Sequence, residues 1–389
     1  MKAVDEPKTI IDVVEEFDYS TQNEKYNNDF RKWRKNKNNP FAFNFSLNKK
    51  ESIFIDGKGF VNNSPAISER ETISRIFYII GSAMLMWVTV ENIIGKIIIY
   101  ILDILGINIH ATFFSTSCYG GSIEIVTIMT IISLIKIYAP AIYIHRKLKM
   151  PLSVEFMGTM NHPTELISAI AMSLIICTIT SIPDAYSSSA KEIYDYFKSI
   201  NADISVWGQA EYVIYTIFDV IIMSVSAEIL FRGAIFSALR QFGDIFAIIV
   251  TSLMASLLTQ NLPDMLTVFL ISLIASAGML KSGSIFTAFA VRTVFKMYQL
   301  TIVIIESSTS ENMFLTRNLL MTGIFILSTV AVIVIHFTRK NKNYLVKYYS
   351  DVSLKERLIF SLRTFPFMAL TAVCIICSLI HNSEPTRRS

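Results

Sequence analysis

The chain has 389 residues, of which 52% are hydrophobic and only 17% are charged, and its mean hydropathy is +0.48. This composition excludes an ordinary water-soluble enzyme and indicates an integral membrane protein with several spans. The net charge of +4 is small and gives no reason to expect a nucleic-acid partner. Four cysteines are too few and too scattered for a disulfide framework.

Residues 1–74 are polar and of mixed charge, with no apolar signal-peptide core within residues 1–30. We expect this region to be cytoplasmic and largely flexible. The segment 52–60 alternates in hydrophobicity around Asp56 and Gly57 and predicts one hairpin. A basic cluster in the same region either lies on anionic lipid or only orients the first span; it consists of Arg31, Lys32, Arg34, Lys35 and Lys37.

Apolar runs of spanning length follow in series and predict an all-α bundle of about nine transmembrane helices. Their ranges are 76–105, 123–143, 166–182, 212–239, 245–258, 265–280, 285–305, 319–337 and 358–379. The fifth and sixth runs are short for a membrane span. A C-x-x-C pair, Cys374 and Cys377, lies inside the last apolar run, so we interpret both residues as small hydrophobic side chains.

The positive-inside rule gives the predicted orientation. With nine spans and a cytoplasmic N-terminus, the basic loop residues all fall on the cytoplasmic side, while the alternate loops are acidic or lack Lys and Arg. These basic residues are Arg146, Lys147, Lys149, Arg232, Arg240, Lys281, Arg339, Lys340, Lys342, Lys347, Lys355 and Arg357. We therefore expect a multi-pass protein of the cell membrane with its N-terminus in the cytoplasm.

The fourth span contains the sequence SAEILFRGAIFSALR, which places one acid and one base inside an apolar helix. Glu228 and Arg232 are four residues apart, so they share a helix face and can pair. Ionisable groups inside a membrane span are costly and therefore indicate a functional site. The alternative is a buried ion pair that only fixes the helix register. Gly233 leaves room for the close approach of another backbone.

From this point the sequence resembles the CPBP intramembrane proteases, the CAAX-protease and bacteriocin-processing family, over about ninety residues of the chain. The pattern of that family is Glu-Glu-x-x-x-Arg-Gly, then Phe-x-x-x-His, then a Gly-Ser turn before His-x-x-x-Asn. By this resemblance the second Glu falls on Glu228, and the Arg and Gly fall on Arg232 and Gly233. The turn falls on residues 282–284. The resemblance divides the chain into the N-terminal region 1–74, accessory helices in 75–206, a CPBP-like core in 207–306, and C-terminal helices with a short tail in 307–389.

The positions at which the family carries its chemistry are replaced in this chain. The first Glu, which in the family is expected to activate water, is Ala227. The Phe and His of the second motif fall on Ala255 and Thr259, and the His and Asn of the third fall on Arg292 and Lys296. None of the five histidines lies within the block; they are His110, His145, His162, His336 and His381.

Peptide hydrolysis needs a base to take a proton from water and donors for the developing oxyanion. Glu228 is the remaining candidate base, but pairing with Arg232 would make its carboxylate a weaker base. The sequence predicts no cofactor and no metal site. Glu228 and Asp219 can instead form a charge network with Arg232, Arg292 and Lys296, which leaves excess positive charge for a lipid headgroup or a peptide carboxylate. Alternatively, the last two cations reach the cytoplasmic interface.

The sequence therefore predicts a degenerate, non-catalytic member of the CPBP family that acts as a binding, scaffolding or partner-regulating subunit. Its expected partners are membrane lipids and a membrane protein or peptide, and no nucleic acid. Two alternatives stay open at this point. One is a divergent membrane endopeptidase that uses Glu228, and the other, favoured only by the number of helices, is a transporter or permease subunit.

Overall fold

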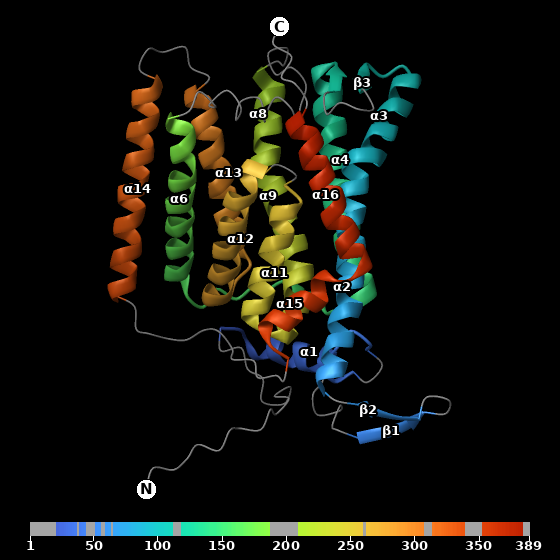
Figure 1. Ribbon diagram of the computed structural model, residues 1–389. Helices are drawn as coiled ribbons and strands as arrows, with labels where there is room; N and C mark the ends of the chain where they lie inside the picture. Colours follow the sequence, from blue (N-terminus) through green and yellow to red (C-terminus); the bar gives the residue numbers. More distant parts are fainter. Residues whose placement is uncertain are drawn as a thin grey trace.

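The computed structural model of the chain describes residues 21–36, 39–43, 51–55, 59–63, 65–111, 118–186, 209–259, 262–306, 313–338 and 352–383. Long upright helices form a bundle, with the short helix α1 (Glu24–Lys35) and the hairpin of β1 (Glu51–Ile55) and β2 (Gly59–Asn63) at its lower end in Figure 1. Two antiparallel two-stranded sheets are the strand structure of the described residues. The predicted all-α membrane bundle is thus confirmed.

Most long helices run without a break. They are α4 (Ser122–Leu148), α6 (Pro163–Tyr186), α12 (Leu262–Ser282), α13 (Phe286–Glu306) and α14 (Met313–Thr338). Other helices are interrupted by π-helical or 3-10 turns. They comprise α2 (Pro65–Thr89), η2 (Val90–Ile94) and α3 (Gly95–Ile104), and then α8 (Gln209–Ile217), η4 (Phe218–Met223), α9 (Ser224–Glu228), η5 (Ile229–Phe236), α10 (Ser237–Leu239) and η6 (Arg240–Phe242).

The shorter elements are α1 (Glu24–Lys35), α5 (Leu152–Glu155), α11 (Asp244–Leu257), α15 (Leu354–Leu362), α16 (Phe365–Ser383), β1 (Glu51–Ile55), β2 (Gly59–Asn63), β3 (Ile109–Ala111) and β4 (Cys118–Gly120). Strand β1 pairs with β2, with Ile55 opposite Gly59. This register confirms the hairpin predicted around Asp56 and Gly57.

The expected number of about nine spans is too high for the described residues. Seven helices are long and apolar enough to cross a membrane, or eight if α15 and α16, which are bent by 75° at their junction, count as one span. The predicted fifth span is α11, whose 14 residues rise only about 21 Å at 1.5 Å per residue. That length is less than the roughly 30 Å of the hydrocarbon core.

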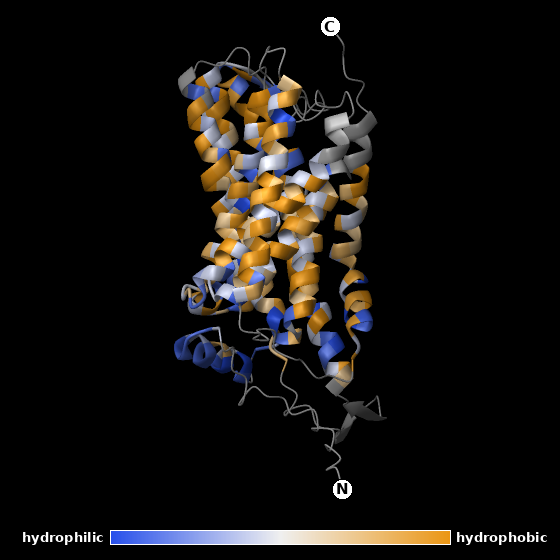
Figure 2. Ribbon diagram, turned by 90° about the vertical axis from the view of Figure 1, so that its left-hand side faces the viewer, coloured by the Kyte–Doolittle hydropathy of each residue, from blue (hydrophilic) through white to orange (hydrophobic). Residues whose placement is uncertain are grey.

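The surface of the bundle has the hydropathy expected of a protein surrounded by lipid. Its helices are largely hydrophobic, whereas α1 outside the bundle is hydrophilic (Figure 2). Helix α14 is the clearest example, because only 11% of its most apolar window is buried. Leu327 and Phe337 on this helix are 73% and 83% exposed, which places an apolar face toward the bilayer.

Helix α1 differs from the expectation that residues 1–74 are largely flexible. Its side chains Tyr26, Phe30 and Trp33 are buried in the main hydrophobic core, and burying a large apolar side chain contributes about 1.5–3 kcal/mol. Of the basic cluster, Arg34 is buried and donates to the carbonyl of Phe43 at 2.7 Å. This part of the N-terminal region is therefore a packed element of the fold.

Contacts of the N-terminal segment (residues 21–36 and 39–43) show which helix ends lie together at one end of the bundle. They include Trp33 Nε1 to Leu148 O at 3.0 Å, Gln22 Nε2 to Gly283 O at 2.9 Å and Arg240 to Tyr26 Oη at 2.9 Å. Arg357 joins the same end by donating to Phe242 O at 2.8 Å. The basic loops near Leu148, Arg240, Gly283 and Arg357 therefore share one end of the bundle as predicted. Arg339, Lys340, Lys342 and Lys347 lie outside the described residues. One correction concerns Arg232, which is buried within the bundle and does not end its span.

Candidate functional site

The span Val213–Phe242 carries the acidic and basic residues of the predicted site, and its backbone is irregular where they lie. Asp219 is on the π-helical segment η4, and Arg232 is on the π-helical segment η5, with Glu228 at the end of α9 between them. Single π turns inside α-helices occur frequently at functional sites. The irregular backbone therefore coincides with the charged residues of this span.

Glu228 and Arg232 form the predicted ion pair deep inside the protein. One guanidinium nitrogen of Arg232 lies 2.9 Å and 3.1 Å from the two carboxylate oxygens of Glu228. The side chains are 0% and 1% exposed for Arg232 and Glu228 respectively. Two charges at such depth are stabilised only when they are paired and hydrogen-bonded, and this geometry supplies both.

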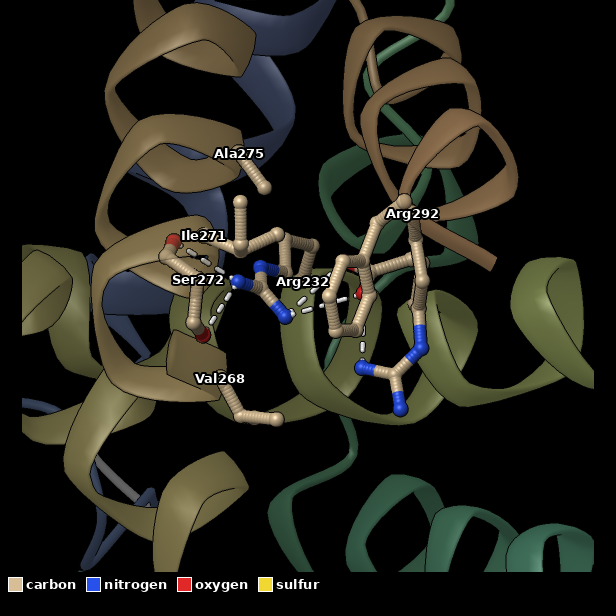
Figure 3. A pocket seen from close by; sticks show the side chains of 8 residues that line it. Arg232, Val268, Ile271, Ser272, Ala275 and Arg292 are labelled. Carbon is tan, nitrogen blue, oxygen red and sulfur yellow. Dashed lines mark hydrogen bonds and ion pairs between the residues drawn. The ribbon is translucent and has the colours of Figure 1, made fainter. Parts of the chain in front are cut away.

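The second terminal nitrogen of Arg232 contacts the neighbouring helix α12. It donates to the carbonyl oxygen of Ser272 at 2.8 Å and to the hydroxyl oxygen of the same residue. Figure 3 shows Arg232 between Ser272 and Arg292. Ser272 was missed by the sequence analysis, because one serine in an apolar helix gives no signal of its own. Arg232 thus fixes α12 against the span that carries Glu228.

Arg292 on α13 approaches the same carboxylate from the other side. Its guanidinium nitrogen lies 3.2 Å from a Glu228 oxygen, and its side chain is 25% exposed. Glu228 is therefore held between two guanidinium groups. Beside them is a cavity of about 20 Å³, whose other lining residues are Val268, Ile271, Ser272, Ala275 and Phe295. Such a volume holds about one water molecule and no peptide.

One helical turn along α13, Lys296 forms a second pair. Its ammonium nitrogen lies 3.0 Å and 3.4 Å from the carboxylate oxygens of Asp219. The two side chains are 23% and 18% exposed. The two predicted acids and three predicted cations therefore pair in two groups, the cluster around Glu228 and the pair of Asp219 with Lys296. We call the two groups together the charge network; its formal charge is positive. Arg292 and Lys296 turn toward acids of the bundle, which argues against the alternative that they extend to the interface.

The remaining predicted positions do not join this network. The hydroxyl of Thr259 donates to the carbonyl of Ala255 in the last turn of α11 at 3.3 Å, and Thr259 does not line the cavity beside Glu228. Thr259 lies two residues beyond Leu257, the last residue of α11, so the short helix ends before this position. Ala227 is a buried residue of the hydrophobic core, 3% exposed. Cys374 is also buried in that core, while the side chain of Cys377 lies outside the described residues.

The predicted turn after α12 is present and needs its glycine. Gly283 has φ +83°, a backbone conformation that residues with a Cβ rarely adopt. A Cβ there would lie 2.4 Å from the carbonyl oxygen of Thr21 and 2.8 Å from that of Thr159. At Gly233 the carbonyl of Glu155 approaches as expected, but a Cβ would meet it at an ordinary 3.5 Å. The small residue is thus required at the turn and optional on the helix.

Polar residues at the end of the bundle were also missed. Nδ1 of His145 and Oε1 of Glu155 are 2.8 Å apart, and burial raises the pKa of Glu155 although this hydrogen bond lowers it. Arg240 pairs with Asp244 at 3.0 Å and donates to Tyr26, whose pKa is raised by burial. The i, i+4 spacing of the second pair was the available sequence signal.

These features define a class: a multi-pass helical membrane protein whose core holds a carboxylate between guanidinium groups of two helices. Residues 209–298 match the family described as type II CAAX prenyl endopeptidase Rce1-like. The chain is therefore a CAAX-protease-like membrane protein, as the motif resemblance implied, and the match covers the helices that form the charge network. No curated protein and no solved structure matches the chain.

Proposed function

We propose that this protein is a non-catalytic, CAAX-protease-like subunit that binds or regulates a membrane-embedded partner. One observation carries the proposal: the only family carboxylate retained in the motif, Glu228, lies 2.9 Å from Arg232 and 3.2 Å from Arg292. The Oε1 oxygen of Glu228 accepts from both guanidinium groups, so the carboxylate would have to give up these bonds before it could take a proton from water. General acid and base groups contribute typically about 10² to 10⁴-fold each to hydrolysis.

The surroundings of Glu228 support the same proposal. The adjacent cavity of about 20 Å³ admits a water molecule but no scissile bond of a peptide. The five histidines of the chain all lie outside the matched residues 209–298. His145, one of them, is paired with Glu155 at the end of the bundle instead. The charged groups of the core therefore support helix association better than proton transfer.

The proposal includes the location of the protein. We place it in the cell membrane with the N-terminus on the cytoplasmic side, because the basic loops among the described residues lie at the end where α1 packs. Membrane lipids and a membrane-protein or peptide partner would then meet the outer helices, and nucleic acid has no role. The charge network would keep the core rigid while those outer surfaces bind.

The test is a cleavage assay with the purified protein in lipid nanodiscs. Prenylated CAAX-type peptides and leader-type peptides are the substrates, and an active CAAX endopeptidase in the same nanodiscs is the positive control. We expect no cleavage by the parent protein. Cleavage by the parent that is lost in a folded Glu228→Gln variant would overturn the proposal and establish the endopeptidase alternative.

A second arm measures binding. Photo-crosslinking in intact cells with the parent and with the Glu228→Gln variant should retrieve the same membrane partners in the same yield. Where the single variant does not fold, Glu228→Gln with Arg232→Met takes its place, because it removes both charges of the buried pair. Loss of the partners from a folded variant would show that Glu228 acts directly in the interaction.

A further inference from the structure

A second cavity lies at the end of the bundle where α2 begins and α4 ends. It is an open groove of about 400 Å³, and residues of α2, α4 and the N-terminal segment line it. The two helices pack side by side, and Arg75 in the first half of α2 and Lys147 in the last turn of α4 both line the groove. The charge network around Glu228 has no part in it.

The charged lining of this groove is cationic. Arg75 and Lys147 line it, and no carboxylate is among the described residues that do so. Arg75 has an ion pair with Glu71 at 3.4 Å, but both side chains are more than half exposed, at 54% and 61%. Such an exposed pair contributes little and exchanges readily with another anion. The two cations are therefore available to a negatively charged group.

The rest of the lining is aromatic and apolar. Tyr143 lies beneath the ammonium of Lys147, whose nitrogen is 5.9 Å from the ring centroid. Tyr78 is 57% exposed on the outer surface of the bundle, and Ile79 below it is buried. Tyrosines are enriched where a membrane protein meets the headgroup region. The groove thus joins a cationic part to an apolar part along one outer face.

We propose that this groove binds one anionic phospholipid, with its phosphate between Arg75 and Lys147 and an acyl chain beside Tyr78. Basic pockets between transmembrane helices recognise anionic headgroups in this way. A lipid satisfies both parts of the lining, whereas a soluble phosphate satisfies only the cations. Phe41 of the N-terminal segment also lines the groove, so a bound lipid would contact this segment together with α2 and α4.

The experiment uses the full chain in a mild detergent with added phosphatidylglycerol or with phosphatidylcholine of the same acyl chains. Native mass spectrometry measures retained lipid, and thermal unfolding measures stabilisation. We expect one phosphatidylglycerol to be retained in preference to phosphatidylcholine and to raise the Tm. Loss of two cations, Arg75→Gln with Lys147→Gln, should weaken its retention about thirtyfold.

The matched control is Arg146→Gln with Lys149→Gln, which removes the same charge from the same end of α4 but from exposed residues outside the groove. This control should bind phosphatidylglycerol like the parent. If the double groove variant does not fold, Lys147→Gln alone and its conservative partner Lys147→Arg replace it, with retention expected to weaken about fivefold in the former and to stay at the parent level in the latter. Equal loss in the control, equal retention of both lipids, or displacement by inorganic phosphate at matched concentration would overturn the proposal.

Discussion

The ion pair between Glu228 and Arg232 offers a quantitative test of the buried site. Changing Arg232 to Met keeps an unbranched side chain but removes the bonds to Glu228 and to Ser272. A buried pair broken by loss of one partner costs about 3–5 kcal/mol, because a lone charge stays in the interior. Arg292 remains 3.2 Å from the carboxylate, so we expect the lower end of that range, about 3 kcal/mol.

The reverse change, Glu228→Gln, leaves Arg232 buried with Arg292 nearby and no anion between them. We expect it to cost about 3–5 kcal/mol as well. If the two residues acted independently, the double variant would lose the sum of the two single losses in unfolding free energy, about 6–8 kcal/mol. Because the double variant removes both buried charges, we expect it to be more stable than either single variant, at a cost below about 2 kcal/mol.

The assay is equilibrium unfolding of purified protein by titration with a denaturing detergent, followed by circular dichroism. Arg75→Gln is the control, since its pair with Glu71 is more than half exposed and should contribute only about 0–1 kcal/mol. An Arg232→Met variant as stable as the parent would show that the pair is not buried. Additive losses in the double variant would show that the two charges are not coupled.

Three further changes concern the end of the bundle where α1 packs. Gly283→Ala should lower the Tm, because a Cβ would meet a carbonyl oxygen at 2.4 Å. Trp33→Phe should increase proteolysis of the N-terminal segment, because it removes the donor to the buried carbonyl of Leu148 at 3.0 Å, at a cost of about 1–3 kcal/mol. Burial raises the pKa of Glu155 above its usual 4.5, so the folded state keeps this proton to higher pH than the unfolded chain. The contribution of protonated Glu155 to the free energy of unfolding should be full below pH 4.5 and should fall as pH rises through the raised pKa. Unfolding curves measured over a series of pH values should show this fall in the parent protein and not in Glu155→Gln.

Each of these changes has a control in the same chain. Gly323→Ala should leave stability unchanged or raise it, because a Cβ there meets nothing within 4 Å on helix α14. Lys32→Ala removes an exposed residue of α1 and should leave proteolysis unchanged. A Gly283→Ala protein as stable as the parent, unchanged proteolysis of Trp33→Phe, or the same pH slope in Glu155→Gln would contradict the corresponding prediction.

Hydropathy predicted the long helices because a membrane span needs about 20 apolar residues whatever its neighbours are. It also predicted the extent of α11, since the apolar run 245–258 corresponds to Asp244–Leu257, but counting this short run as a membrane span was wrong. The short length of α11 also explains why Thr259 is absent from the site. The alignment with the family motif placed Thr259 there, but the helix ends before this residue. The end of the apolar run at residue 258, followed by Asn261 and Pro263, was therefore a better guide to the end of this helix than the motif register.

The docking of α1 was missed although its signal was present. Tyr26, Phe30 and Trp33 are four and three residues apart, the spacing of one helix face. The flanking charges concealed that face, since the mean composition of the segment is strongly polar. Local periodicity was therefore more informative than composition in this region. The groove that this segment lines with α2 and α4 could not be predicted from the sequence.

The irregular backbone of the span Val213–Phe242 explains how both of its acids can pair with cations of the same helix, α13. Asp219 and Glu228 are nine residues apart, which in a regular α-helix is two and a half turns and places them on opposite faces. Both nevertheless contact α13, through Lys296 and Arg292. The π-helical segment η4, which begins at Phe218, has more residues per turn than an α-helix, so the two carboxylates come closer to one face. Two cations four residues apart on α13 thus meet two acids, and an irregular backbone lets this membrane core hold three cations with two anions.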